Sequence, residues 1–260
     1  MNLKSKLLLA LLATSSAAFA QTAPEAPAAP EVTYNVGVVS QYRYRGIAQT
    51  KGGPALQGGV DYANANGFYL GTWASTIKWI KDAAYQGTGA QAKGPVELDV
   101  YGGYKFEAAG LAYDVGYLRY QYVGNTYKDA APKANVNANT DEAYGAATFG
   151  PATLKYSYAF SDLFGYANSH GSNYWDLSAT FDIGNGFSLV PHVGRQTVKN
   201  YSATSYNDFA LTLNKDLGDG LSASLAGIAT NGNADNFKAL SSSSYNAAKN
   251  TVVVGVKYSF

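Results

Sequence analysis

The chain has 260 residues, with 19 Lys and Arg against 18 Asp and Glu, a net charge of +1, and no cysteine. The lack of cysteine excludes a disulfide framework and thiolate chemistry, and the balanced charge offers no basic surface for nucleic acid. Tyrosine and glycine are abundant, at 22 and 28 residues, while only 14% of residues are charged. That composition suits a sheet whose outer face meets lipid.

The first twenty residues have the pattern of a secretory signal peptide. Lys4 and Lys6 precede an apolar stretch that is too short to span a bilayer as a helix, and Ala18-Phe19-Ala20 fits a small-x-small cleavage site. We therefore expect residues 1–20 to be removed during export. Residues 21–31 are rich in Pro and Ala and predict a flexible leader. Residues 32–260 remain as a single domain.

Strand-like segments follow, joined by connections that alternate between short and long. The short ones are rich in Gly, Asn and Pro, which favour tight turns, and they lie at Asn64–Gly67, Glu107–Gly110, Gly150–Pro151, Gly184–Gly186 and Leu217–Gly220. The long ones are polar and lie at Ile47–Gly53, Ile80–Gly94, Gly124–Thr140, Gly165–Ser172, Asn200–Ser205 and Asn231–Lys249. This alternation and the even count of about twelve strands predict an all-β, membrane-spanning, antiparallel up-and-down barrel. Its short turns would be periplasmic and its long loops extracellular.

Alternation within the strands assigns their two faces. Val32, Tyr34, Val36, Val38, Tyr42 and Tyr44 share one face of the first strand, and Thr33, Asn35, Gln41, Arg43 and Arg45 share the other. Because a charge at the bilayer midplane costs about 2–4 kcal/mol, the charged faces should line the lumen. Arg119 falls on the lipid side of its strand, which suggests a bulge or a position above the membrane. Residues 68–77 are apolar on both faces and leave their phase open.

The last strand resembles a barrel's closing strand. Val252, Val254, Val256, Tyr258 and Phe260 share one face, and the pattern alone would also fit an edge strand of a soluble sandwich. With the turns and the signal peptide, we expect Val252–Phe260 to pair antiparallel with Val32–Arg45. Lys257 should then point into the lumen near the periplasmic mouth. Tyr258 and Phe260 resemble the terminal signal of outer-membrane barrels, which predicts the barrel-assembly machinery as a partner.

Several segments resemble a known family. VSQYRYRGIAQT, PALQGGVDY and GFYLGTWAS, followed by VELDVYGGYKF, YLRYQYVG and YSYAFSDLFG, are similar to the TorF family of proteobacterial porins. The resemblance covers most of the mature chain and implies an outer-membrane β-barrel with porin-like transport. It supplies no catalytic or binding residues to carry over.

The charged lumen residues are the candidate pore lining: Arg43, Arg45, Asp61, Glu97, Asp99, Lys105, Asp114, Glu142, Lys155, Asp176, Asp182, Asp208 and Lys257. Arg43 and Arg45 could line a constriction that binds anionic groups, or they could form a charge network that fills and stiffens the barrel. Strand direction places five acids near these two arginines, namely Glu97, Asp99, Glu142, Asp176 and Asp208. It places the three lysines near Asp61, Asp114 and Asp182 at the periplasmic end. The acid excess in the outer tier predicts a mild preference for cations.

Other chemistry has weaker support in the sequence. His170-Gly-Ser172-Asn173 matches a His-x-Ser-Asn stretch of outer-membrane phospholipase, in which His activates Ser, but it lies in a Gly- and Asn-rich loop where chance explains it. The other histidine, His192, sits mid-strand. Two separated histidines and no cysteine predict no metal site, and no motif predicts a cofactor. We expect the protein not to be an enzyme.

The sequence therefore predicts a narrow outer-membrane channel for passive diffusion of small hydrophilic solutes or ions. Twelve strands lie between a filled barrel and a wide pore, and the small inward residues Gly59, Gly103, Gly116, Gly194, Ser222 and Gly255 would leave room for a bore. The alternatives are a plugged barrel that acts through its extracellular loops and, more remotely, a membrane lipid hydrolase. Outer-membrane lipid and lipopolysaccharide are expected to surround the barrel.

Overall fold

The computed structural model describes residues 30–82, 92–130, 136–239 and 245–260. The expected signal peptide and residues 21–29 of the leader lie outside this part. The strands are β1 (Glu31–Val39), β2 (Arg43–Tyr44), β3 (Ile47–Ala48), β4 (Ala55–Ala63), β5 (Phe68–Thr76), β6 (Val96–Ala108), β7 (Leu111–Tyr122), β8 (Thr140–Phe149), β9 (Ala152–Ala159), β10 (Asn173–Ala179), β11 (Phe181–Gly184), β12 (Phe187–Thr197), β13 (Tyr206–Gly218), β14 (Leu221–Thr230) and β15 (Thr251–Ser259). Short helices lie in the long connections: α1 (Trp79–Asp82), α2 (Tyr127–Ala130), α3 (Ala234–Ala239) and the 3-10 turn η1 (Ser202–Thr204).

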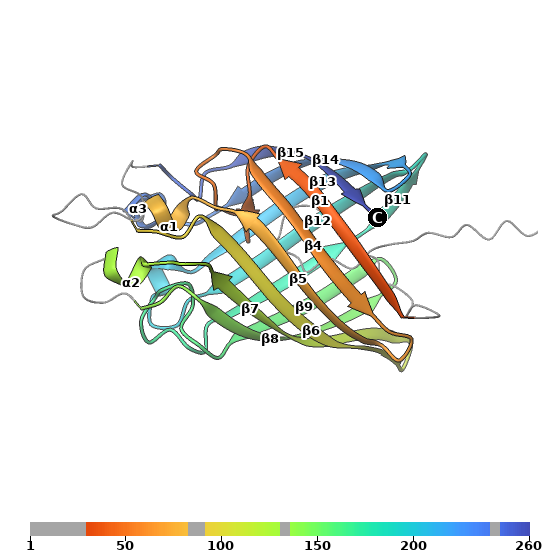
Figure 1. Cartoon of the computed structure of the whole chain (residues 1–260), viewed down its shortest axis with the longest axis horizontal. Helices are drawn as coiled ribbons and strands as arrows, with labels where there is room; N and C mark the ends of the chain where they lie inside the picture. The colour runs from red at the N-terminus through yellow and green to blue at the C-terminus, as the bar shows by residue number, and fades with distance from the viewer. Residues whose placement is uncertain (1–29, 83–91, 131–135, 240–244) are drawn as a thin grey trace, which may run out of the picture.

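These strands close into a twelve-stranded antiparallel barrel, because β10 and β11 together form one strand and β2 and β3 pair only with each other (Figure 1). The closure is the pairing of β15 with β1, in which Asn35 faces Ser259 and Val39 faces Gly255. The predicted fold and the predicted closing strand are both confirmed. None of the helices in the described ranges is long and apolar enough to cross a membrane.

The connections sort by length to the two ends of the barrel. The tight turns have pairs of residues with positive φ, such as Asn185 with Gly186 and Asp219 with Gly220, which suits two-residue hairpins. The long connections and their helices lie at the other end, which we call the loop end; the chain's C-terminus lies at the end of the tight turns, the turn end (Figure 1). This is the arrangement that the sequence predicts.

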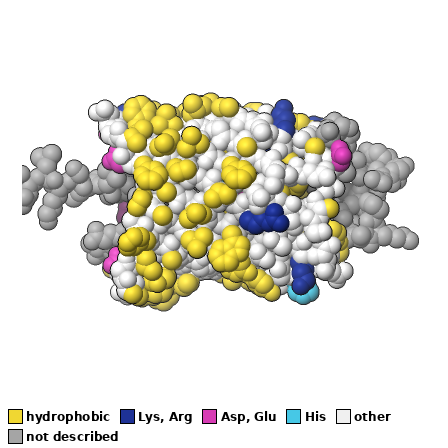
Figure 2. Space-filling model, turned by 180° about the vertical axis from the view of Figure 1, so that it is seen from behind, with side chains coloured by type: hydrophobic (Ala, Val, Ile, Leu, Met, Phe, Trp, Pro, Cys, Tyr) yellow, Lys and Arg dark blue, Asp and Glu magenta, His cyan; other side chains and the backbone are white. Residues whose placement is uncertain are grey.

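The outer wall of the barrel is apolar. Phe68, Leu70 and Val252 are 59%, 60% and 62% exposed, and apolar side chains cover much of the wall on the turn-end side, with Lys and Arg appearing toward the loops (Figure 2). A water-soluble monomer rarely exposes so large an apolar surface. The two faces of β5 can now be assigned. Phe68 and Leu70 point outward, and Tyr69 and Trp73 are buried inside the barrel.

The first strand ends earlier than the sequence predicts. β1 stops at Val39, and Tyr42 and Tyr44, which we expected on the lipid face, are buried inside the barrel at 0% and 7% exposure. The chain turns inward at this point and forms the small β2–β3 hairpin. Arg45 and Gly46 have φ values of 44° and 77°, the two positive values of a type I′ turn. The apolar alternation runs on past the end of β1, so periodicity alone could not reveal the break.

The barrel lumen and its mouth as the candidate functional site

The inward hairpin of residues 43–48, which we call the lumen hairpin, reaches the opposite wall of the barrel. Nη1 and Nη2 of Arg45 donate to the Glu142 carboxylate on β8 at 2.9 and 2.7 Å, and Nη1 also donates to Oε1 of Gln196 on β12 at 2.8 Å. The guanidinium also lies over the rings of Tyr44 and Tyr174, at 4.9 and 4.3 Å from their centroids. Since the hairpin starts beside β1 and its tip binds β8 and β12, it narrows the lumen.

Arg45 of the hairpin and the preceding Tyr42 are both buried, and each is bound to a carboxylate. Burial alone would lower the pKa of Arg45, but the Glu142 carboxylate, together with Tyr44 and Tyr120, outweighs burial and raises that pKa well above its usual value. Burial, together with the charge of Glu97, raises the pKa of the Tyr42 hydroxyl, which donates to Glu97 at 2.6 Å. The arginine thus stays charged and the tyrosine stays a donor. Both fix the hairpin against the wall.

Arg43 does not line a pore. It is fully buried, and its Nη1 donates to the carbonyl oxygens of Gly46, Ala247 and Lys249 at 3.1, 2.8 and 3.0 Å. Burial lowers the pKa of this guanidinium from its usual value. The side chain therefore joins the hairpin to the last long connection. Its predicted role fails because it belongs to the hairpin and not to β1.

The predicted acidic tier lies inside the barrel near the hairpin. Glu97, Asp99, Glu142 and Asp208 are each at most 2% exposed, and Oδ1 of Asp99 has no hydrogen-bond partner in the described part of the chain. Sequence reasoning missed the counter-ion of this tier. His192 lies 3.4 Å from Asp176 and 2.9 Å from Asp208, and only its inward phase on β12 could have indicated this.

A second polar tier lies nearer the turn end. The Tyr101 hydroxyl donates to Asp61 at 2.5 Å, and the Tyr69 hydroxyl donates to Asp114 at 2.6 Å. Lys105 and Lys155 lie over aromatic rings, at 5.3 Å from Tyr69 and 3.9 Å from Tyr144, and Lys257 lies within electrostatic reach of Asp61. Asp182, by contrast, is exposed at the rim, where it accepts the backbone N–H of Gly184 at 2.8 Å.

The inward glycines do not leave open space, contrary to our expectation. A Cβ added at Gly116 would collide with the Tyr144 hydroxyl, and one at Gly194 would collide with the Tyr174 hydroxyl. Gly116 and Gly194 therefore each accommodate an aromatic ring from a neighbouring strand, as glycines in strands often do where another group approaches closely. Glycine content alone could not show this, because it carries no information on which side chains fill the gaps.

The His170–Ser172 pair is part of a structural loop. Ser172 is fully buried, its hydroxyl donates to the Ser169 carbonyl at 2.6 Å, and its oxygen accepts the Lys199 N–H at 2.9 Å. His170 is exposed. The serine hydroxyl thus caps backbone groups of two connections. Within the described residues, no group of three or more His, Cys, Asp or Glu side chains could hold a metal ion.

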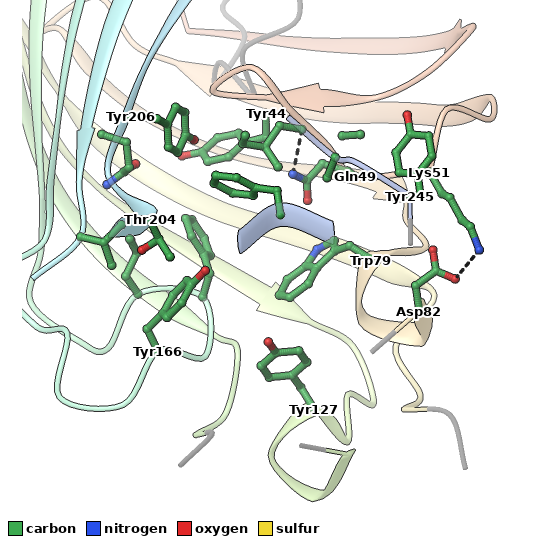
Figure 3. A pocket seen from close by; sticks show the side chains of 18 of the residues that line it. Tyr44, Gln49, Lys51, Trp79, Asp82, Tyr127, Tyr166, Thr204, Tyr206 and Tyr245 are labelled. Atoms are coloured by element: carbon green, nitrogen blue, oxygen red, sulfur yellow. Dashed lines mark hydrogen bonds and ion pairs between the residues drawn. The ribbon is translucent and has the colours of Figure 1, made fainter. Parts of the chain in front are cut away.

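At the loop end, the long connections surround a pocket lined mainly by aromatic side chains, among them Tyr44 of the hairpin (Figure 3). The pocket adjoins the lumen hairpin, since Tyr44, Ile47 and Ala48 line it together with Gln196, the residue that binds Arg45. The mouth of the barrel is therefore apolar, while the lumen beneath it is charged.

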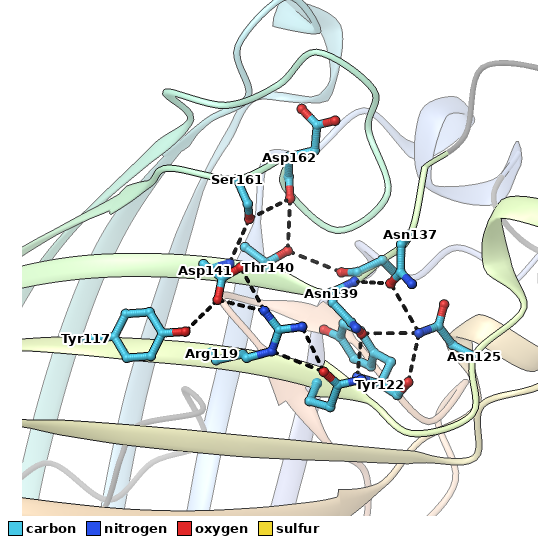
Figure 4. Close-up of polar contacts among 12 residues, drawn as sticks. Tyr117, Arg119, Tyr122, Asn125, Asn137, Asn139, Thr140, Asp141, Ser161 and Asp162 are labelled. Atoms are coloured by element: carbon cyan, nitrogen blue, oxygen red, sulfur yellow. Dashed lines mark hydrogen bonds and ion pairs between the residues drawn. The ribbon is translucent and has the colours of Figure 1, made fainter.

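Arg119 lies on the outer wall near the loop end of β7, and no bulge accounts for it, since β7 pairs without a register shift on both sides. Its Nη1 donates to both carboxylate oxygens of Asp141 at 2.9 Å, and the Tyr117 hydroxyl donates to the same carboxylate at 2.6 Å (Figure 4). Of our two expectations, the bulge is wrong. The position near the loops fits the other.

Comparisons with known proteins agree with this architecture. The model of a bacterial protein family of unknown function, Gcw_chp, matches residues 23–260, and none of the curated proteins matches the chain. The resemblance to the TorF family is not confirmed.

Solved outer-membrane proteins share the fold. The KdgM porin superposes with a TM-score of 0.54 at 10% identity, covering 88% of this chain and 99% of its own. An outer membrane channel from Pseudomonas putida F1 gives 0.54 at 13% identity, covering 93% and 98%. The NanC porin gives 0.51 at 12% identity, covering 88% and 99%. At these identities the similarity establishes the outer-membrane porin fold.

Proposed function

The chain belongs to the Gcw_chp family of bacterial proteins of unknown function, and we propose that it is a narrow outer-membrane channel for passive diffusion of small hydrophilic solutes or ions. The observation that carries the proposal is the closed barrel with an apolar outer wall and two charged tiers inside. Buried charges are costly even when they are paired, so two charged tiers are unexpected in a barrel that only needs a filled core. The predicted signal peptide supports export to the outer membrane.

The lumen charges favour cations. Around the hairpin, the carboxylates of Glu97, Asp99 and Glu142 stand against the guanidinium groups of Arg43 and Arg45. His192 carries at most one positive charge against Asp176 and Asp208, so five carboxylates face three cationic side chains in this tier. Rings of acidic side chains select cations in channels. The preference would be mild, because ion pairs cancel most of these charges.

Recordings in planar bilayers across a KCl gradient test the channel and its selectivity together. We expect single-channel currents with a reversal potential on the cation-selective side, and a smaller reversal potential for Asp99→Asn. Asp182→Asn is the matched control, since that carboxylate lies exposed at the rim and its loss should leave selectivity unchanged. An anion-selective reversal potential would contradict the cation preference.

A plugged barrel that acts through its loops is the second candidate. The lumen hairpin favours it, because Arg45 at its tip binds Glu142 across the lumen, and Tyr42, just before the hairpin, donates to Glu97 on β6. Absence of current from wild-type protein, with current restored when the hairpin is released, would support this candidate against a permanently open channel.

We also propose partners for the outer surface of the barrel. The apolar wall would contact outer-membrane lipid, and lipopolysaccharide would surround the level of Arg119 and Tyr117 near the loops. Tyr258 and Phe260 stack at 5.4 Å on the outer face of β15, where the barrel-assembly machinery could recognise them.

A further inference from the structure

The aromatic pocket at the loop end is built by all six long connections. One residue from each illustrates this, in chain order Tyr44, Trp79, Tyr127, Phe164, Thr204 and Tyr245, and the rings face a common space (Figure 3). A surface assembled from six separate connections is not the by-product of one loop packing on itself. The pocket has the form of small-molecule sites, which are concave and mostly apolar with a few polar groups.

Its walls are fixed by contacts between rings. Trp79 packs edge-to-face against Tyr122 at 5.1 Å and against Tyr127 at 5.3 Å, and Phe164 does the same with Tyr44 at 5.7 Å. Such pairs contribute beyond the area that they bury. The pocket is therefore preformed, which lowers the cost of binding.

The lining has no net charge. Lys51 and Asp82 are its charged residues, and they pair with each other at 3.6 Å. Charged solutes would lose their hydration against aromatic walls without gaining a free counter-charge. A sugar would place hydroxyls all around its ring against walls whose exposed surface is mostly apolar. An uncharged molecule with apolar faces fits better.

Two polar atoms of the lining are buried without a hydrogen-bond partner in the described part of the chain: Nε1 of Trp79 and the hydroxyl of Tyr245. Buried polar groups are almost always paired, and an exception requires an explanation. An indole N–H only donates. The missing partner of Trp79 is therefore a hydrogen-bond acceptor.

The size of the space indicates a single ring. The cavity measures about 120 Å³, which is close to the cavity of about 150 Å³ that binds benzene in an engineered protein. We infer that this pocket binds uncharged monocyclic aromatic molecules that carry a hydrogen-bond acceptor, with the ring held between the loop aromatics and the acceptor on the Trp79 N–H. The inference goes beyond the proposed channel, because binding at the mouth requires no conduction.

The test is calorimetric titration of the full chain in lipid nanodiscs with benzamide, which is uncharged and has a carbonyl acceptor. We expect saturable binding, and about five-fold weaker binding to Trp79→Phe, which keeps a ring but loses one neutral hydrogen bond. Trp175→Phe is the control, since Trp175 faces outward and is 47% exposed, and it should bind as the wild type does. Circular dichroism of each variant verifies the barrel.

The outcomes separate this proposal from the channel. Benzoate tests charge and methyl α-glucoside tests a sugar; binding of either as tight as that of benzamide would overturn the inference. So would equal binding by Trp79→Phe, or no binding to the wild type. Benzamide binding by a barrel that carries no current would overturn the proposed channel and leave the pocket proposal intact. Current without benzamide binding would overturn the pocket proposal and leave the channel intact.

Discussion

At the scale of single residues, the contrast between two arginine–carboxylate pairs gives a stability prediction. The Arg45–Glu142 side chains are 5% and 2% exposed, whereas the Arg119–Asp141 side chains are 38% and 18% exposed. Removing one member of a buried pair leaves an uncompensated charge and costs about 3–5 kcal/mol, but an exposed pair is worth about 0.2–1 kcal/mol. Arg45→Ala should therefore destabilise the barrel several-fold more than Arg119→Ala.

Urea unfolding in lipid vesicles measures both free energies. The double variant Arg45→Ala with Glu142→Ala should recover much of the stability lost in Arg45→Ala, because the unpaired carboxylate is removed. Equal costs for Arg45→Ala and Arg119→Ala would mean that water reaches the hairpin pair freely.

At the scale of elements, the type I′ turn of the lumen hairpin predicts a conductance change. Gly46 has φ +77°, and a Cβ there would meet the Asp208 side chain at 2.7 Å, so Gly46→Ala should strain the turn by about 1–2 kcal/mol. We expect the hairpin to shift from the wall and the bilayer conductance to rise. Gly67→Ala is the control, since Gly67 has φ +91° in a tight turn at the opposite end. It should cost at least as much stability, because a Cβ there would also meet the Lys105 carbonyl oxygen, without changing conductance. A rise in conductance in both variants would remove the hairpin from the explanation.

The hairpin also shows where sequence reasoning reaches its limit. Period-two alternation locates regular strands well, as at β6, where Glu97 and Asp99 are buried inside while Val100 faces out. It could not place Tyr42 and Tyr44, because their alternation continues from β1 after the backbone has left the sheet. It also missed the His192 bridge and the aromatic rings over the inward glycines, since both depend on residues that are distant in sequence.

At the scale of the whole molecule, closure depends on the seam between β1 and β15. Phe260 exchanges both backbone hydrogen bonds with Tyr34, at 2.8 and 2.9 Å, and its ring stacks on Tyr34 and Tyr258 with centroids 5.7 and 5.4 Å apart. The terminal residue therefore contributes to the seam in two separable ways.

Two variants divide these contributions. Phe260→Ala keeps the backbone bonds and loses two ring pairs worth about 0.5–1.5 kcal/mol each, whereas deletion of Phe260 also loses two hydrogen bonds worth about 0.5–1.5 kcal/mol each. Urea unfolding in vesicles should give the lowest free energy of unfolding for the deletion, a higher one for Phe260→Ala and the highest of the three for Phe149→Ala. Phe149 is the control because it is 72% exposed near the turn end and has no stacked partner among the described rings. If Phe149→Ala proved as costly as Phe260→Ala, lipid contact and not the seam would account for the loss. If the barrel-assembly machinery reads the terminal ring, Phe260→Ala should also lower the amount of assembled barrel in cells by more than its stability predicts, with Phe149→Ala again unaffected.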